Sequence, residues 1–174
     1  MGKITVAMYI SLDGVMETPS WTAPYWEEQL SDYQDQAQRE ASALLLGRVT
    51  FEQFAAAWPS SADEGAPFMN GIDKVVPTTT LSAPYWKAQF LHGDVAQQLQ
   101  KLRERENLLV YGSAQLVRYL FAQDLVDEYR EMVFPLILGQ GKKLFDGSAA
   151  GPCQFTRLES QRTPRQVLLN TYRR

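Results

Sequence analysis

The sequence predicts an α/β fold with a mostly parallel central sheet and antiparallel C-terminal strands. Apolar segments with the character of strands alternate with amphipathic segments of helical period along most of the chain. Two of these short apolar strands break at a glycine, Gly47 or Gly112, and pass directly into a helix. The chain then ends in two strand-like segments, near 154–161 and 166–173, with no helix between them. Strands joined by helices run parallel, whereas strands joined by a turn pair antiparallel.

The first half of the chain alternates between strand and helix patterns. We expect a strand at 3–11, a loop at 12–24, a helix at 25–41, a strand at 43–46, a helix at 48–57, a loop at 58–71 and a strand at 73–80. The helix at 25–41 is indicated by an apolar stripe at helical spacing, formed by Trp26, Leu30, Tyr33 and Ala37. Prolines, glycines and serines gather in the two loops.

The second half continues the alternation and then changes character. We expect an irregular segment to 93, a helix at 94–105, a strand at 108–111, a helix at 114–122, a strand at 126–134 and the two C-terminal strands. Asp94 is a suitable N-cap for the first of these helices, with Gln97 three residues later. Ser113 suits the N-cap of the second, where Leu116 and Leu120 mark a buried face.

Composition favours one compact domain over 1–174. The 174 residues are 45% hydrophobic, enough to bury a core without a metal or a disulfide. The single cysteine, Cys153, excludes an internal disulfide and fits a reducing compartment. With one histidine, His92, the chain lacks the ligands and bases of common metal sites and Ser-His triads, so we expect no metal.

The N-terminal segment and the charge distribution narrow the functional classes further. Residues 1–10 are too short and too strand-like for a signal peptide, and no apolar run reaches membrane-spanning length. We therefore expect a cytoplasmic protein that does not bind membranes. The net charge of −3 is spread over interspersed acidic and basic residues, which argues against a nucleic-acid partner.

The two strand–glycine–helix junctions are natural anion sites. Each helix begins with free backbone N–H groups and the positive end of its dipole, and Gly47 or Gly112 lets the backbone approach a ligand closely. Arg48 adds a full positive charge at the first junction. Two such cradles at the carboxyl ends of neighbouring strands would suit a dinucleotide. Plain α/β packing is the alternative interpretation, and the Gly-x-Gly-x-x-Gly fingerprint is absent after every strand.

Four motifs together resemble one family. They are Ser11-Leu12-Asp13-Gly14, the segment Gly47–Glu52, Gly112-Ser113-Ala114, and Leu125–Tyr129 followed by Phe134–Phe145. In this order and spacing the chain resembles the dihydrofolate-reductase-like family, typified by the C-terminal reductase domain of the bifunctional riboflavin-synthesis deaminase-reductase. The resemblance covers nearly the whole chain and implies a dihydrofolate-reductase-like three-layer fold.

The resemblance also implies a reaction. It is hydride transfer from NADPH or NADH to a small heterocyclic substrate, as in a 5-amino-6-(5-phosphoribosylamino)uracil reductase or a dihydrofolate reductase. A diverged module that binds a nucleotide or heterocycle without turnover is the alternative. Relatives commonly form homodimers, and the apolar stretch Val133–Leu138 exceeds what one small sheet needs to cover itself, so we expect a homodimer.

The junctions and the resemblance together nominate site residues. Expected cofactor contacts are Val15, Gly47, Arg48, Val49, Thr50, Thr78, Thr79, Thr80, Gly112, Ser113, Ala114, Gln115 and Leu116. Expected substrate contacts are Asp13, Trp21 and Tyr25. An Asx-turn is the alternative role of Asp13, and packing of the 12–24 loop is the alternative role of Trp21 and Tyr25.

Two features separate this chain from its relatives. Relatives often carry Ser-Arg-Thr-Leu at the end of this strand, and their serine and arginine bind the 2′-phosphate of NADPH. In this chain Thr78 and Thr79 stand in the places of that serine and arginine. Threonine supplies hydroxyls but no charge, so a preference for NADPH would depend on Arg48. The proton donor is unassigned: Asp32, on the helix at 25–41, is a weak candidate, and a solvated helix acid is the simpler interpretation.

Overall fold

The computed structural model describes residues 2–148 and 152–174. Its strands are β1 (Lys3–Ser11), β2 (Ala43–Leu45), β3 (Asp73–Pro77), β4 (Ala88–Leu91), β5 (Asn107–Val110), β6 (Glu128–Phe134), β7 (Arg157–Arg162) and β8 (Leu168–Arg173). Its α-helices are α1 (Glu28–Glu40), α2 (Arg48–Ala57), α3 (Ala66–Gly71), α4 (Val95–Arg103) and α5 (Ala114–Ala122). Two short 3₁₀ helices, η1 (Pro19–Tyr25) and η2 (Trp58–Ser60), complete the elements.

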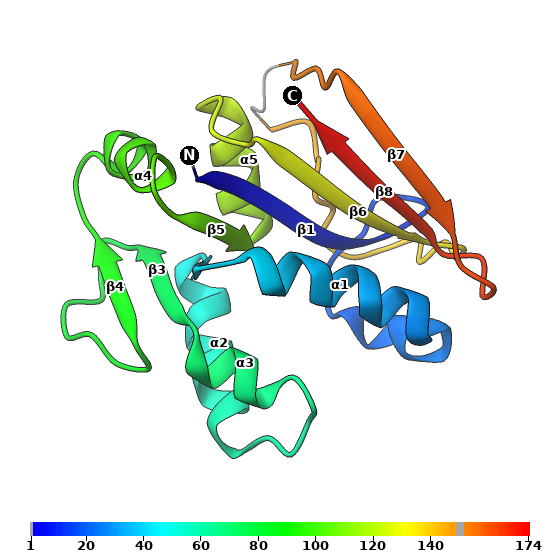
Figure 1. The fold of residues 1–174 in the computed structure, drawn as a ribbon, viewed down its shortest axis with the longest axis horizontal. Coiled ribbons are helices and arrows are strands. Elements are labelled where there is room, and N and C mark those ends of the chain that lie inside the picture. Colours follow the sequence, from blue (N-terminus) through cyan, green and yellow to red (C-terminus); the bar gives the residue numbers. More distant parts are fainter. Residues whose placement is uncertain (1, 149–151) are drawn as a thin grey trace.

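The strands form one eight-stranded sheet in the order β4-β3-β2-β5-β1-β6-β8-β7 (Figure 1). The pairs formed among β1 to β6 are all parallel. Strand β8 runs antiparallel to both β6 and β7. This topology confirms the predicted α/β fold with a mostly parallel sheet and antiparallel C-terminal strands.

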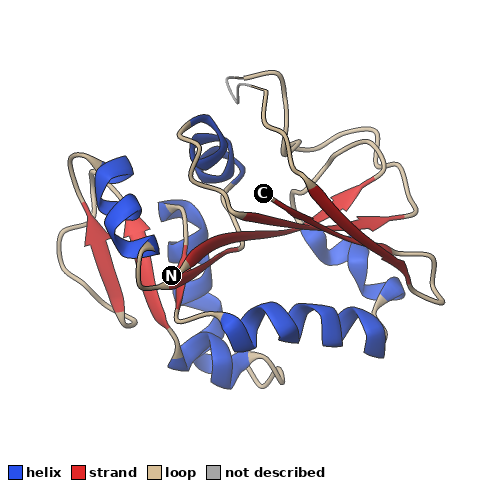
Figure 2. Cartoon of the chain, turned by 45° about the horizontal axis from the view of Figure 1, so that its top comes forward, coloured by secondary structure: helices blue, strands red, loops and turns tan. Residues whose placement is uncertain are grey.

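Helices cover both faces of the sheet and make three layers (Figures 1 and 2). Alternate residues of β1 point to opposite faces, so Ile4 and Val6 pack in the core on the α4 and α5 side. Ala7 packs in the second core, on the side of α1, α2 and α3. None of the helices in the described residues has the length and apolarity needed to span a bilayer.

Most element expectations hold, with shifts near prolines. The helix expected from residue 25 begins at Glu28, because η1 occupies Pro19–Tyr25 and Pro24 lies inside it. Trp26 and Glu27 then adopt extended backbone geometry, which separates η1 from the α-helix. The strand expected at 73–80 ends at Pro77, and the chain turns after Thr78, whose hydroxyl accepts from the N–H groups of Thr80 and Leu81.

Two expectations of irregular structure were wrong. The segment 58–71, expected as a loop, contains α3, whose Pro67 lies in the first turn, where a missing N–H costs nothing. The irregular segment before 93 contains β4, which pairs parallel with β3 at the edge of the sheet. Both elements are short and have little hydrophobic patterning, so neither the helical period of α3 nor the strand period of β4 was visible in the sequence.

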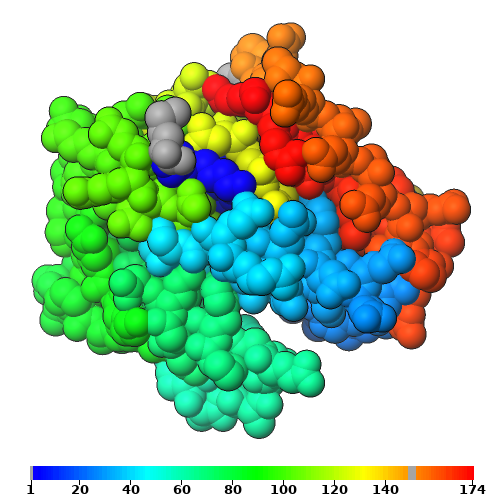
Figure 3. Space-filling view, in the orientation of Figure 1, coloured from blue at the N-terminus to red at the C-terminus, as the bar shows by residue number. Residues whose placement is uncertain are grey.

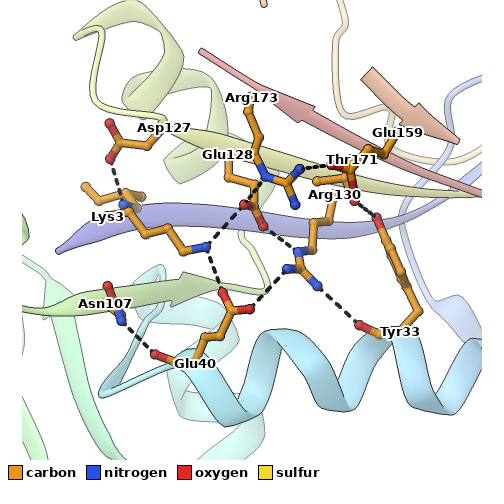
Figure 4. Close-up of polar contacts among 11 residues, drawn as sticks. Lys3, Tyr33, Glu40, Asn107, Asp127, Glu128, Arg130, Glu159, Thr171 and Arg173 are labelled. Carbon is orange, nitrogen blue, oxygen red and sulfur yellow. Dashed lines mark hydrogen bonds and ion pairs between the residues drawn. The ribbon is translucent and has the colours of Figure 1, made fainter. Parts of the chain in front are cut away.

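A buried ionic cluster ties α1 to three strands (Figure 4). Glu128 and Arg130 are 2% and 1% exposed, and Arg130 Nε donates to Glu128 Oε1 at 2.5 Å. Lys3 Nζ and Arg173 Nε donate to the other carboxylate oxygen at 3.1 and 2.9 Å. Burial raises the pKa of Glu128, but the hydrogen bonds and charges of Arg130 and Arg173 outweigh it and hold that pKa below its usual range.

Candidate active site

The two glycine junctions lie side by side at the carboxyl edge of the sheet. Strands β2 and β5 are neighbours, with Leu45 opposite Val110. The Gly47 N–H donates to the carbonyl of Gly112 at 3.0 Å. A Cβ atom on Gly47 would lie only 2.6 Å from Ser113 Oγ, so this contact requires glycine. The two anion sites expected from sequence are therefore parts of one surface.

The start of α2 offers free hydrogen-bond donors. Gly47 is the N-cap and no side chain caps the helix. The N–H groups of Arg48, Val49 and Thr50 have no protein acceptor within residues 2–148 and 152–174. Arg48 donates to Glu52 at 2.6 Å, and both side chains are about 40% exposed. An exposed pair of this kind is weak, so a bound anion can compete for Arg48.

The start of α5 is partly satisfied by its own side chain. Ser113 Oγ accepts from the Leu116 N–H at 3.3 Å, as a capping residue does. Ala114 and Leu116 are buried and Gln115 is exposed. The Gly112–Ser113 peptide bond is cis. The second cradle therefore offers fewer free donors than the first.

The threonines after β3 lie at the same edge of the sheet, one strand beyond β2. Thr78 Oγ1 accepts from the N–H groups of Thr80 and Leu81, both at 3.2 Å, and so holds the turn. Thr79 and Thr80 are exposed. The structure thus leaves Thr79 and Thr80 accessible at this edge and uses the Thr78 hydroxyl to shape the backbone.

Asp13 joins two loops. Its carboxylate accepts from the Ser11 hydroxyl at 2.6 Å and from the N–H groups of Leu138 and Gly139 at 3.1 and 2.9 Å. The Ser11 hydroxyl is the largest of these influences, and together they lower the pKa of Asp13 to about 2. The carboxylate therefore fixes the loop after β6 against the loop after β1, a role that the alternative interpretation, an Asx-turn, does not describe.

Val15, Trp21 and Tyr25 are also used in packing. Val15 is 1% exposed and forms a β-bridge with Lys143. The Trp21 and Tyr25 rings meet Phe134 edge to face at centroid distances of 5.4 and 5.7 Å. Both rings stay half-buried. The aromatic loop thus packs against the end of β6, as the alternative interpretation held.

Asp32 is exposed on α1, whose buried residues are Leu30, Tyr33 and Ala37. It therefore lies on the solvent side of the helix.

A neutral polar group that the sequence did not single out lies beside the junctions. Tyr9 OH donates to Gln34 Oε1 at 2.5 Å, and Gln38 Nε2 donates to Tyr111 OH at 3.1 Å. Tyr111 directly precedes Gly112. Burial raises the pKa of Tyr111 to about 12 and raises that of Tyr9 as well, so both hydroxyls stay protonated at neutral pH.

Two weak signals in the sequence belong to this group. Gln34 and Gln38 are four residues apart, beside the apolar stripe of α1, and Tyr111 ends the strand before a junction glycine. Only the packing of α1 across β1 and β5 brings them together.

The family described as the RibD C-terminal domain matches residues 2–169 of this chain. An uncharacterized protein of Bacillus subtilis, YyaP, is 24% identical over 154 residues, which are 82% of this chain and 80% of that protein. A putative riboflavin biosynthesis protein from Shewanella sp. PV-4 has a TM-score of 0.77 at 18% identity, covering 99% of this chain and 98% of its own. Dihydrofolate reductase from Enterococcus faecalis, complexed with NADP(H), has a TM-score of 0.65 at 14% identity, with coverage of 99% and 96%.

Proposed function

Because the chain belongs to the RibD C-terminal domain family, we propose that it is a reductase that uses NADPH or NADH to reduce a small heterocyclic substrate. The observation that carries this proposal is the pairing of two glycine–helix junctions on adjacent strands, joined by the hydrogen bond from Gly47 to Gly112. The dihydrofolate reductase that shares this fold is itself a complex with NADP(H).

The residues present fit a dinucleotide. The three free N–H groups at the start of α2 and the Arg48 side chain would hold one phosphate. The N–H groups of Ala114 and Gln115 at the start of α5 have no protein acceptor in the described chain and would hold another. The bound nicotinamide would supply the hydride, and the protein would supply its position.

The neutral polar group formed by Tyr9, Gln34, Gln38 and Tyr111 suits the substrate. Its hydroxyls and amides can donate to and accept from a flat heterocycle without adding charge. Tyr111 adjoins Gly112, so a substrate held there lies next to the cofactor junction. Asp13 and the aromatic loop would act by fixing the surrounding loops, given their contacts with Gly139 and Phe134.

The proposal extends to partners and location. We infer a small-molecule substrate, a homodimer and a cytoplasmic protein without a nucleic-acid or membrane partner. The net charge of −3 supports the last point, since nucleic-acid binding requires a concentration of positive charge.

Cofactor binding tests the proposal. NADPH or NADH should raise the melting temperature by mass action on the native state and quench tryptophan fluorescence. Loss of cofactor absorbance across a panel of pterin, pyrimidine and imine compounds should then identify a substrate. If neither cofactor changes the melting temperature at millimolar concentration, the reductase proposal fails.

Binding without turnover would favour the second candidate, a module that holds a nucleotide or heterocycle. The observation that favours this candidate is that Asp32, the weak candidate for the proton donor, is exposed on α1, and no hydrogen bond or ion pair within the described residues fixes its carboxylate.

A further inference from the structure

One face of the C-terminal part of the sheet lies on the side of α5 and not of α1. Tyr33 of α1 is hydrogen-bonded to Thr171 Oγ1 at 2.8 Å, so Thr171 faces α1, and the next residue of β8, Tyr172, faces the other way. Tyr129 of β6 pairs directly with Tyr172 and shares its face, and its ring meets that of Phe121 of α5 at a centroid distance of 5.7 Å. Figure 3 shows β7 and β8, in orange and red, forming the flank of the molecule to which this face belongs.

A cavity of about 320 Å³ opens on this face. A cavity of roughly 150 Å³ can hold one benzene molecule, so this one has room for a compound of one or two rings. Among the described residues, one side chain of the lining, Glu131, carries a formal charge. The lining includes five aromatic rings and this carboxylate, from Phe121, Tyr129, Phe145, Phe155, Tyr172 and Glu131.

The aromatic rings favour a cation over an anion. The Tyr129 and Tyr172 rings are 5.9 Å apart between centroids, with their planes within 18° of each other. Phe155 is tilted by 29° from Tyr129 at 6.5 Å, and Phe145 meets the same ring edge to face at 6.4 Å. The faces of such rings carry partial negative charge, which attracts an ammonium group that lies over them. Clustered aromatic rings are a recurrent way for proteins to bind ammonium ligands.

The Glu131 carboxylate forms no ion pair within residues 2–148 and 152–174. By contrast Glu128, three residues earlier on the same strand, pairs with three cations. Glu131 accepts from Tyr129 OH and from Asn170 Nδ2, both at 3.3 Å. Both bonds are long and both donors are neutral, whereas a carboxylate can accept about four hydrogen bonds. A half-buried carboxylate among aromatic rings is therefore short of a counterion.

Two arginines near this face do not supply that counterion. Arg174 Nη2 donates to the Cys153 thiol at 3.3 Å, at the cavity lining, but its guanidinium is already paired with Asp124. Arg162 shares the face, one register row beyond Glu131 and two strands away, and it is exposed. The charge that a ligand meets inside the cavity is therefore that of Glu131.

We propose that this cavity is a binding site for a small organic cation, a protonated primary amine carried on an apolar body of one or two rings. The ammonium group donates to the Glu131 carboxylate, which replaces part of its lost hydration. The apolar body packs against the rings of Phe155 and Tyr172 and is removed from water. An anion of the same shape is repelled by Glu131 and by the ring faces.

This site is separate from the two glycine junctions. Phe121 lies seven residues beyond Ala114, which is about 10 Å along the axis of α5, and the second junction is at the start of that helix. The neutral polar group of Tyr9 and Gln34 lies on the α1 side of the sheet. The inference therefore goes beyond the proposed reductase function and does not depend on it.

Three probes with the same ring and different charges test the site. We would titrate the whole chain with 2-phenylethylamine, 2-phenylethanol and 3-phenylpropionate by calorimetry near pH 7, where the amine is protonated. The amine should bind about tenfold or more tightly than the alcohol, and the acid should not bind at millimolar concentration. Glu131→Gln should remove the advantage of the amine and leave the alcohol unchanged. Phe155→Leu should weaken the amine and the alcohol alike.

Glu159→Gln is the matched control, because Glu159 is an exposed carboxylate of β7 that contacts Arg173, and it should bind all three probes as the wild type does. Far-UV circular dichroism checks that each variant is folded, and the comparison of the three probes on the wild type needs no variant. An alcohol that binds as tightly as the amine overturns the inference, as does an amine affinity that Glu131→Gln leaves unchanged. So does an absence of binding by all three probes. In that last case a change in sedimented mass in Leu158→Arg, at a 59% exposed position of the same face, would assign the face to another copy of the chain.

Discussion

At the scale of single residues, Arg48 is the one charge placed at the first junction, and its pair with Glu52 is exposed. If Arg48 holds the 2′-phosphate, Arg48→Ala should weaken NADPH much more than NADH, by about 1.5–3 kcal/mol, the value of a charge-assisted hydrogen bond. Titration calorimetry with both cofactors measures the difference. Arg157→Ala is the matched control, because Arg157 is exposed on β7, five strands from β2 in the sheet order.

Thr79→Arg tests the same idea in the opposite direction. Thr79 is exposed at the end of β3, next to β2, and an arginine there restores a permanently charged planar group. We expect tighter NADPH binding with NADH nearly unchanged. Equal effects on the two cofactors would mean that residue 79 does not face the 2′ position.

Lys74 is buried, and its ammonium group contacts no carboxylate among the described residues. It is 1% exposed, its Nζ donates to the Met69 carbonyl at 2.5 Å, and it lies 3.8 Å from the centroid of a Trp86 ring. Burial, and then the charge of Lys87, lower the pKa of Lys74 from 10.5 to about 8. The unfolded chain therefore binds more protons between these two values, and the free energy of unfolding rises with pH across that window.

Lys74→Met should remove this rise. Urea denaturation between about pH 7.5 and 9.5, below the range where free tyrosines ionise, measures it. Lys101→Met, at an exposed position of α4, should keep the wild-type slope. A wild-type free energy that stays flat over this interval would contradict the lowered pKa.

The residues that sequence analysis could place are those whose function lies in the local backbone. Gly47 and Gly112 were recognisable because a strand that breaks at glycine before a helix has one geometry. Asp13 was nominated as a site residue, but its partners Leu138 and Gly139 could not be predicted, because they lie about 125 residues away in the chain. Sequence analysis did not identify Gln34 and Tyr111 for a similar reason. Neither helical nor strand periodicity shows which side chains of α1 contact the end of β5.

At the scale of elements, the Glu128 cluster connects β6 to β1, β8 and α1. Among the described residues, Glu128→Gln leaves Arg130, which is 1% exposed, with only the 3.8 Å ion pair to the 40%-exposed Glu40, and removing the buried partner of such a pair costs about 3–5 kcal/mol. Urea denaturation should show this loss. Glu159→Gln, which breaks only the exposed contact with Arg173, should cost about 1 kcal/mol or less.

The double variant Glu128→Gln/Arg130→Met separates pairing from packing. If the loss comes from an uncompensated buried charge, removing both charges should recover part of it. A double variant less stable than Glu128→Gln would show that the cluster stabilises the fold through the packing of its side chains and not through the pairing of its charges.

Helices and strands were predictable where the hydrophobic period and the length of the segment indicated the same structure. Strands β1, β2, β5 and β6 and helices α1, α2, α4 and α5 have apolar patterns that only one structure satisfies. Helix α3 and strand β4 are held by their neighbours: Trp86 Nε1 donates to Asn70 Oδ1, and β4 pairs with β3. Their formation depends on tertiary contacts, so no local sequence pattern predicts them.

At the scale of the whole molecule, the sheet order interleaves the two halves of the chain. Strand β1 lies between β5 and β6, and β5 in turn separates it from β2. No cut in the sequence divides such a sheet into two sheets that keep their pairings. We therefore expect residues 1–174 to unfold as one cooperative unit.

The positions of the tryptophans make this expectation testable. All four, Trp21, Trp26, Trp58 and Trp86, lie in the first half of the chain, so their fluorescence reports only that half. Amide hydrogen exchange of the peptide covering 166–174 reports β8, the strand that joins β7 to the sheet. At one fixed protein concentration the two signals should share a single urea midpoint, because β8 bonds along its whole length to β6, and β6 to β1. Exchange of 166–174 at lower urea than the fluorescence change would mean that the β7–β8 hairpin melts separately and that the sheet is not one cooperative unit.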